Sequence, residues 1–144
     1  MNGNFSAFEI SASGLSAERL RMETTANNIA NANTTDTETG EPYRRRSVVF
    51  SAVLDEVANR TFDHGLGGVD VVGISKDPTE FPVVYDPGHP HADDEGMVRL
   101  TNVKIPNEMV DLISASRSYE ANLKAMTTYK EMIEQTLTLL RGGR

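Results

Sequence analysis

The sequence predicts a mainly α-helical fold with a small amount of β-structure, in which a long helix at each end of the chain flanks a small β-rich middle region. Near both ends, apolar residues recur with the spacing of an amphipathic helix. In the middle, short clusters of β-branched residues alternate with Gly and Pro. These patterns divide the chain into an N-terminal helix with an Asn-rich end (residues 1–35), an acidic middle domain (36–106) and a C-terminal helix (107–144).

The first helix is expected over about residues 5–32. Its apolar residues recur every seven positions and lie on one face: Phe8, Leu15, Met22 and Ile29. An Asn-rich run begins at Asn27, and Asn favours helix caps and turns over helix interiors. We therefore expect the first helix to end within this run.

The C-terminal helix gives the stronger pattern. Ten positions follow alternating spacings of three and four, and eight of them are apolar: Met109, Leu112, Ser116, Tyr119, Leu123, Met126, Lys130, Ile133, Leu137 and Leu140. Asn107 is the expected N-cap. The alternative is an amphipathic core helix of an ordinary bundle, but such helices usually run about 8–20 residues. The length of the pattern therefore favours a coiled-coil seam.

The middle domain is expected to hold four short strands: 48–54, 69–74, 83–85 and 97–100. The first of these is alternatively the start of a short helix that reaches Val57. Between the last two strands, Pro87 and Gly88 fit the central positions of a type II turn. The middle domain therefore reads as hairpins joined by turns.

Charge is concentrated in the middle domain, where thirteen acidic residues stand against seven basic ones, so that most of the net charge of −7 lies there. The nearly neutral ends suit close packing against copies of the same chain. No basic stripe is visible, which argues against binding to nucleic acid or anionic lipid.

Targeting and redox signals are absent from the sequence. The first 18 residues contain neither Lys nor Arg, and no apolar run follows them, so we expect no cleaved signal peptide. The longest apolar stretch, within residues 48–54, is too short to cross a bilayer, and no direct membrane insertion is expected. The chain has no Cys, which excludes disulfides and thiolate sites.

One cluster resembles a metal site because it places imidazole and carboxylate groups within ten residues: Asp86, His89, His91, Asp93, Asp94 and Glu95. The intervening Pro and Gly residues equally explain the segment as consecutive turns whose polar side chains bond local backbone. Two His residues two positions apart do not complete a tetrahedral site, so the turn interpretation is favoured. We expect no metal ligands and no cofactor.

No catalytic motif is found, and His64 stands alone, so the sequence does not indicate an enzyme. The run Arg44–Arg46 has two interpretations. It either docks an acidic partner or places positive charge at a strand edge, where charge prevents unwanted strand pairing. The second interpretation is slightly favoured.

Three stretches together resemble the axial proteins of the bacterial flagellum. Residues 26–34 (ANNIANANT) resemble a motif near the N-terminus of rod and hook subunits, and residues 108–122 (EMVDLISASRSYEAN) are similar to the start of their C-terminal helix. Residues 84–98, which begin VYDPGHP, resemble the proximal rod proteins of this family. The short chain agrees, because distal rod and hook subunits carry larger inserted domains.

The resemblance implies a structural subunit of the proximal rod, whose terminal helices pair as an antiparallel coiled coil. It implies assembly with copies of itself and other rod proteins, to transmit torque and line the export channel. It further implies export through the flagellar type III apparatus without a cleaved signal, and a final place in the basal-body rod, in the periplasmic space. The expected assembly interface is Phe8, Leu15, Met22, Asn27, Asn28, Ile29, Asn31, Met109, Leu112, Tyr119, Asn122, Leu123, Met126, Ile133, Leu137 and Leu140.

Two other functions remain as alternatives. One is a soluble metal- or ligand-binding domain that uses the His89/His91 loop. The other is a coiled-coil adaptor with no axial role, which would have no need of the Asn-rich end of the first helix. For these Asn side chains, solvation at a helix end is the alternative to capping backbone or bridging subunits.

Overall fold

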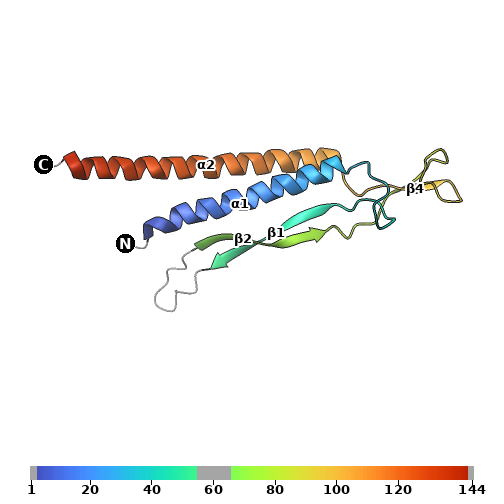
Figure 1. Cartoon of the computed structure of the whole chain (residues 1–144), viewed down its shortest axis with the longest axis horizontal. Coiled ribbons are helices and arrows are strands. Elements are labelled where there is room, and N and C mark those ends of the chain that lie inside the picture. Colours follow the sequence, from blue (N-terminus) through green and yellow to red (C-terminus); the bar gives the residue numbers. More distant parts are fainter. Residues whose placement is uncertain (1–2, 55–65, 143–144) are drawn as a thin grey trace. The chain divides into compact units, whose positions relative to one another are not determined.

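The computed structural model describes residues 3–54 and 66–142 and shows two long terminal helices and a small β region that lies between them in the sequence (Figure 1). Along the chain the elements are α1 (Gly3–Ala30), β1 (Arg46–Leu54), β2 (Leu66–Lys76), β3 (Val83–Tyr85), β4 (Met97–Arg99) and α2 (Ile105–Gly142). This order confirms the predicted fold class. The proposed helix end at Val57 and the isolated His64 lie outside the described residues.

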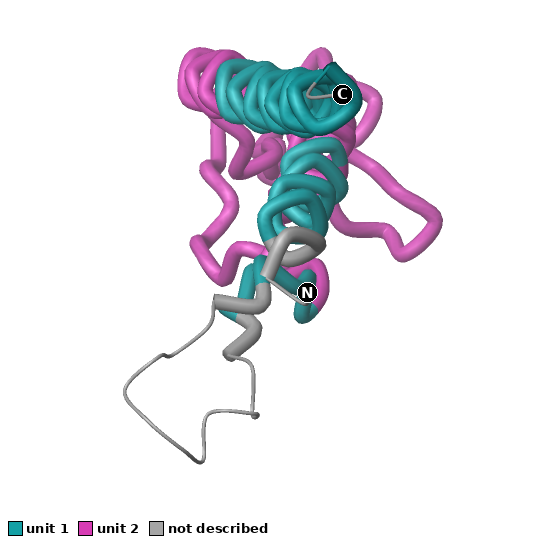
Figure 2. Tube along the Cα trace, turned by 90° about the vertical axis from the view of Figure 1, so that its left-hand side faces the viewer, with its two compact units in different colours: residues 1–19, 50–72, 115–144 teal, residues 20–49, 73–114 magenta. Residues whose placement is uncertain are grey.

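The contacts within the chain define two compact units, coloured separately in Figure 2. Unit 1 comprises residues 1–19, 50–72 and 115–144, and unit 2 comprises residues 20–49 and 73–114. Each unit therefore contains part of both helices. The predicted segment boundaries after residues 35 and 106 both fall inside unit 2, and the three-segment division stays a prediction.

The two terminal helices pack together and run antiparallel, as predicted. In unit 2, Arg21 of α1 pairs with Asp111 of α2, and Asn28 pairs with Glu108, so residue numbers rise along one helix as they fall along the other. In unit 1, a Cβ built on Gly14 would lie only 2.7 Å from Asn122 Nδ2. Helices approach this closely only where one of them lacks a side chain.

The face of α2 that contacts α1 lies beside the predicted apolar stripe. Glu108 and Ala115, seven residues apart, are buried, and Asn122 continues that spacing opposite Gly14. In contrast, Met109 is 54% exposed and Leu123 is 47% exposed. The interface between the helices therefore uses small and polar residues, and much of the predicted apolar stripe faces solvent in the single chain.

The four predicted strands are confirmed, and they form two two-stranded sheets, β1–β2 and β3–β4. In the second sheet the strands are antiparallel, and Val84 pairs with Val98, which is the buried member of that hairpin. The predicted type II turn is wrong. His89 N donates to Asp86 O to close the turn, but Gly88 is not among the glycines with positive φ, which a type II turn requires.

Helix α2 begins two residues before the predicted N-cap. The carbonyl of Lys104 accepts hydrogen bonds from the backbone N–H groups of Asn107 and Glu108, so Asn107 already lies within the first turn. Pro106 is tolerated there because the first N–H groups of a helix have no intrahelical partner. Glu108 lies in this first turn, and its side chain accepts a hydrogen bond from Asn28 of α1.

Candidate functional site: a buried polar joint

A cluster of buried polar side chains links α1, the start of β1 and α2 within unit 2. We call it the polar joint and define it by five residues: Asn28, Tyr43, Arg45, Glu108 and Asp111. Asn28 and Glu108 are each only 1% exposed. Burial of polar groups costs free energy unless each group is hydrogen-bonded, so the partners of these side chains decide whether the joint stabilises the chain.

Asn28 uses all four of its hydrogen-bonding positions. Its Nδ2 donates to Arg46 O at 2.7 Å and to Glu108 Oε2 at 2.8 Å. Its Oδ1 accepts from Tyr43 Oη and from Arg46 N, both at 3.0 Å. An amide has two donor and two acceptor positions, so Asn28 has none left for a neighbouring subunit.

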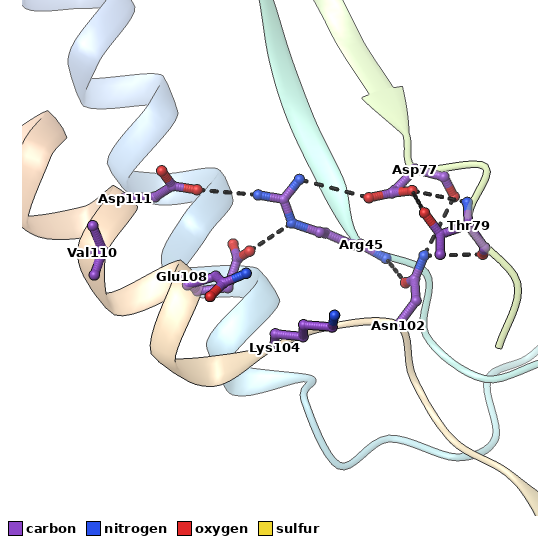
Figure 3. A pocket seen from close by; sticks show the side chains of 9 residues that line it. Arg45, Asp77, Thr79, Asn102, Lys104, Glu108, Val110 and Asp111 are labelled. Carbon is purple, nitrogen blue, oxygen red and sulfur yellow. Dashed lines mark hydrogen bonds and ion pairs between the residues drawn. The ribbon is translucent and has the colours of Figure 1, made fainter. Parts of the chain in front are cut away.

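Arg45 connects three carboxylates, as Figure 3 shows. Its Nε lies 2.6 Å from Glu108 Oε1, its Nη2 lies 3.1 Å from Asp111 Oδ2, and its Nη1 lies 3.8 Å from Asp77 Oδ2. The hydrogen bond with Glu108 raises the pKa of Arg45 above its usual value. Each oxygen of Glu108 accepts one hydrogen bond, Oε1 from Arg45 and Oε2 from Asn28.

Tyr43 covers the joint from the chain segment that leads into β1. Its hydroxyl donates to Asn28, and burial raises the pKa of Tyr43 above its usual value. The phenol is thereby held in its neutral form, which is the form that donates this hydrogen bond.

The backbone of Arg45 is hydrogen-bonded on both its N–H and its carbonyl. Its N–H donates to Asn102 Oδ1 at 2.7 Å, and its carbonyl accepts from Asp77 N at 2.9 Å. The hydroxyl and the N–H of Thr79 donate to the Asp77 carboxylate and lower the pKa of Asp77. A cavity of about 490 Å³ lies beside these groups, with Lys104 and Val110 also in its lining.

This arrangement holds elements together and contains no reactive group. Its buried acceptors face donors, and its guanidinium faces carboxylates, which is the pattern of a structural ion pair. Within residues 3–54 and 66–142, no three His, Asp or Glu side chains are placed to hold a metal ion. The contacts of these side chains are those of a structural joint.

The loop around His89 and His91 is built from turns. Asp86 Oδ1 accepts a hydrogen bond from Gly88 N, and Asp93 Oδ1 accepts from the backbone N–H groups of Glu95 and Met97. His91 contacts the opposite loop, with its Nδ1 3.0 Å from Thr35 Oγ1. The turn interpretation of this segment accounts for these contacts, and no observation in the described part of the chain favours a metal site.

Comparison with known proteins identifies the family. Residues 8–36 match the family described as "Flagella basal body rod protein", and residues 94–139 match "Flagellar basal body rod FlgEFG protein C-terminal". The flagellar basal-body rod protein FlgC of Borreliella burgdorferi is 40% identical over 97% of this chain and 99% of its own length. The chain belongs to the FlgC family. The FlgC proteins of Yersinia enterocolitica (43%) and Aquifex aeolicus (45%) are similar over 92% of this chain and, respectively, 94% and 93% of their own lengths.

As a member of the FlgC family, the chain is a structural subunit of the flagellar basal-body rod and not an enzyme. Asn28 lies in the first matched region, and Glu108 and Asp111 lie in the second. Tyr43 and Arg45 lie between them, so the polar joint ties the two matched regions together. None of the described helices combines the length and apolar character needed to cross a membrane.

The arginine run has a structural role that the sequence did not reveal. Arg45 enters the polar joint, whereas Arg44 donates to the carbonyls of Asp77 and Thr79 and stacks 4.1 Å from the ring centre of Phe81. Arg46 lies 5.6 Å from the ring centre of Tyr43. A local sequence pattern does not reveal an aromatic or acidic partner that lies far along the chain. The run of three arginines was therefore the only sequence signal for these contacts.

The predicted interface residues fall into three groups in this FlgC-family chain. Asn28 is buried and committed within the chain. The exposed group is Phe8, Asn27, Met109, Leu123, Ile133, Leu137 and Leu140. The partly covered group is Leu15, Met22, Ile29, Asn31, Leu112, Tyr119, Asn122 and Met126. Asn31 Nδ2 donates to Asn27 O, so the Asn-rich end of α1 serves local backbone at this point.

Proposed function

We propose that this chain builds the proximal part of the rod by self-association through the exposed faces of its terminal helices, together with other rod proteins. The supporting observation is a group of large apolar side chains that the chain itself leaves in solvent and that the helical repeat places on one face of α2: Leu123, Ile133, Leu137 and Leu140. An exposed apolar face of this kind marks a protein interaction site. Contact with neighbouring subunits would bury it.

The proposal assigns torque transmission and the lining of the export channel to the packed terminal helices. Many helix contacts in parallel resist shear better than one small interface. We also propose that the chain reaches the rod, in the periplasmic space, through the flagellar type III export apparatus and without a cleaved signal. The resemblance of residues 26–34 and 108–122 to axial proteins supports this route.

Replacement of Leu123 by Asp tests the assembly surface. Leu123 is 47% exposed, so a carboxylate at this position can reach water in the single chain, which should still fold. In the rod, a carboxylate buried there without a partner would cost several kcal/mol, on the order of 3 or more. Cells with Leu123→Asp should therefore make and export the subunit, build no complete rod and lack motility in soft agar.

Thr128→Asp is the matched control, because Thr128 is exposed and lies on a different face of α2 while the charge change is identical. That strain should remain largely motile. Equal motility of the two strains would show that the exposed apolar face is not the assembly surface. A strain without a functional export ATPase tests the route, because the subunit should then accumulate in the cytoplasm.

A further inference from the structure

The polar joint makes the contact between α1 and α2 depend on a third element. Asn28 and Glu108 place polar groups in the buried contact between the helices, and they satisfy only one hydrogen bond between themselves. The other partners come from residues 43–46, at and just before the start of β1. They are the hydroxyl of Tyr43 and the N–H and carbonyl of Arg46, which bond Asn28, and the guanidinium of Arg45, which bonds Glu108.

We propose that Arg45 is a positioning residue that determines the register in which α1 and α2 pair, so that helix pairing in unit 2 requires the docking of β1. The proposal concerns the folding of a single chain. It therefore stands or falls independently of the assembly surface proposed above.

The apolar stripes do not determine this register by themselves. Much of the stripe on α2 faces solvent in the single chain, and the apolar residues repeat every seven positions on both helices, so a slide by a full heptad restores the same apolar pattern. The joint has no such repeat. In a shifted register, Glu108 would be buried without Arg45 and Asn28 would face new neighbours, and an unpaired buried charge is strongly destabilising. A single polar group at a helix contact is an established way to fix register.

Among the residues of the polar joint, Arg45 is the one whose charge balances the nearby carboxylates. Glu108 and Asp111 from α2 and Asp77 from the segment after β2 all approach one guanidinium. Two other cations act on these carboxylates, since Arg21 lies 3.6 Å from Asp111 and the charge of Arg44 contributes to lowering the pKa of Asp77, but the hydrogen bond to Glu108 comes from Arg45. Loss of Arg45 therefore leaves the buried Glu108 carboxylate without a cation, next to two further acids.

Hydrogen exchange on the full-length chain distinguishes register control from simple attachment of the strand. We expect Arg45→Ala to lower amide protection roughly a hundredfold, the effect of removing one partner of a buried ion pair. The loss should extend to helix residues 20–30 and 105–114 as well as to the start of β1. Arg46→Ala is the control, because it removes the same charge while its backbone can still bond Asn28, and it should leave the helices protected.

A distance measurement reports the register directly. Because the chain has no Cys, spin labels at Asn27→Cys and Val110→Cys, two exposed positions on the two helices, give a single pair distance. The otherwise wild-type chain should show one narrow distance, and Arg45→Ala a broad or multiple distribution, since a heptad slide moves a label by about 10 Å.

If Arg45→Ala unfolds completely, the pair of substitutions Arg45→Met and Glu108→Met is measured in its place. This double variant replaces the ion pair by apolar side chains. This variant should fold and still show several label distances. The proposal is overturned if this pair keeps the single wild-type distance. It is also overturned if Arg45→Ala loses protection only in the strand, or if the wild-type chain itself shows several distances.

Discussion

Asn28 and Glu108 meet between the two terminal helices through a hydrogen bond of 2.8 Å, although they lie eighty residues apart in the sequence. Neither side chain is accessible to solvent to any useful extent. The pair therefore joins the two terminal helices. If one partner is removed, water cannot reach the other, so substitutions there should strongly lower the free energy of unfolding.

Asn28→Asp should destabilise the chain by about 3 kcal/mol or more, because it removes both donors and places a second carboxylate against Glu108. Urea unfolding followed by circular dichroism measures the change. Asn27→Asp supplies the control, since Asn27 is exposed and carries the same substitution one residue earlier. Similar unfolding midpoints for the two variants would contradict the buried arrangement.

Gly68→Ala should destabilise the docking of β2 on α1 in unit 1. Gly68 has a φ of 106°, and an added Cβ would lie 2.5 Å from Ser13 Oγ, the atom that accepts a hydrogen bond from Val69 N. Strain and overlap together should cost about 2–3 kcal/mol. Faster hydrogen exchange at Val69 is the local readout.

Gly40→Ala separates backbone strain from steric overlap as causes of the lost stability. Gly40 also has a positive φ, of 73°, but an added Cβ there meets no atom within 4 Å. Its cost should be limited to backbone strain, on the order of 1 kcal/mol. If both variants lost the same stability, the close approach of Gly68 to Ser13 would contribute nothing.

Stability should fall at acidic pH in part through Asp77. The hydrogen bonds from Thr79 lower the pKa of Asp77 in the folded chain relative to the unfolded chain. The contribution is therefore present above the unfolded value, about 3.9, and is lost as the pH falls through the lower folded value. Urea midpoints measured between pH 7 and pH 3 should decrease less steeply for Asp77→Asn than for the wild-type chain.

Thr79→Val is the comparison for that titration, because it removes the hydroxyl that donates to Asp77 and keeps the carboxylate. Its pH dependence should be flattened in the same direction as that of Asp77→Asn. If both variants followed the wild-type curve, the hydrogen bonds from Thr79 to Asp77 would contribute nothing to stability.

The helices and strands were predictable because their signals are local. The heptad pattern from Met109 to Leu140 and the β-branched clusters around Val49 and Val72 need only neighbouring residues to be recognised, and the structure confirms both kinds of element. The start of α2 was misjudged by two residues, since Asn107 is a good cap by composition but Lys104 provides the first acceptor.

The polar joint was not predictable, because each of its residues has an ordinary local explanation. Asn28 reads as a residue near a helix end, Glu108 as an acid in a first helical turn, and Arg45 as part of an exposed charge run. Only the fold brings them together. The contact face of α2 was not predictable for a related reason, since the close approach of the helices uses small residues such as Ala115, which a search for large apolar residues does not select.

Helix α2 carries two adjacent faces with separate duties, one closed within the chain at Ala115 and one left open at Leu123 and Leu137. Under the assembly proposed above, substitutions on the open face would alter which neighbours fit and leave the fold of the subunit unchanged. Substitutions on the closed face would change the fold and leave the open face as it is. The proposal therefore implies that compatibility between subunits of different rods could be redesigned by altering one side of a single helix.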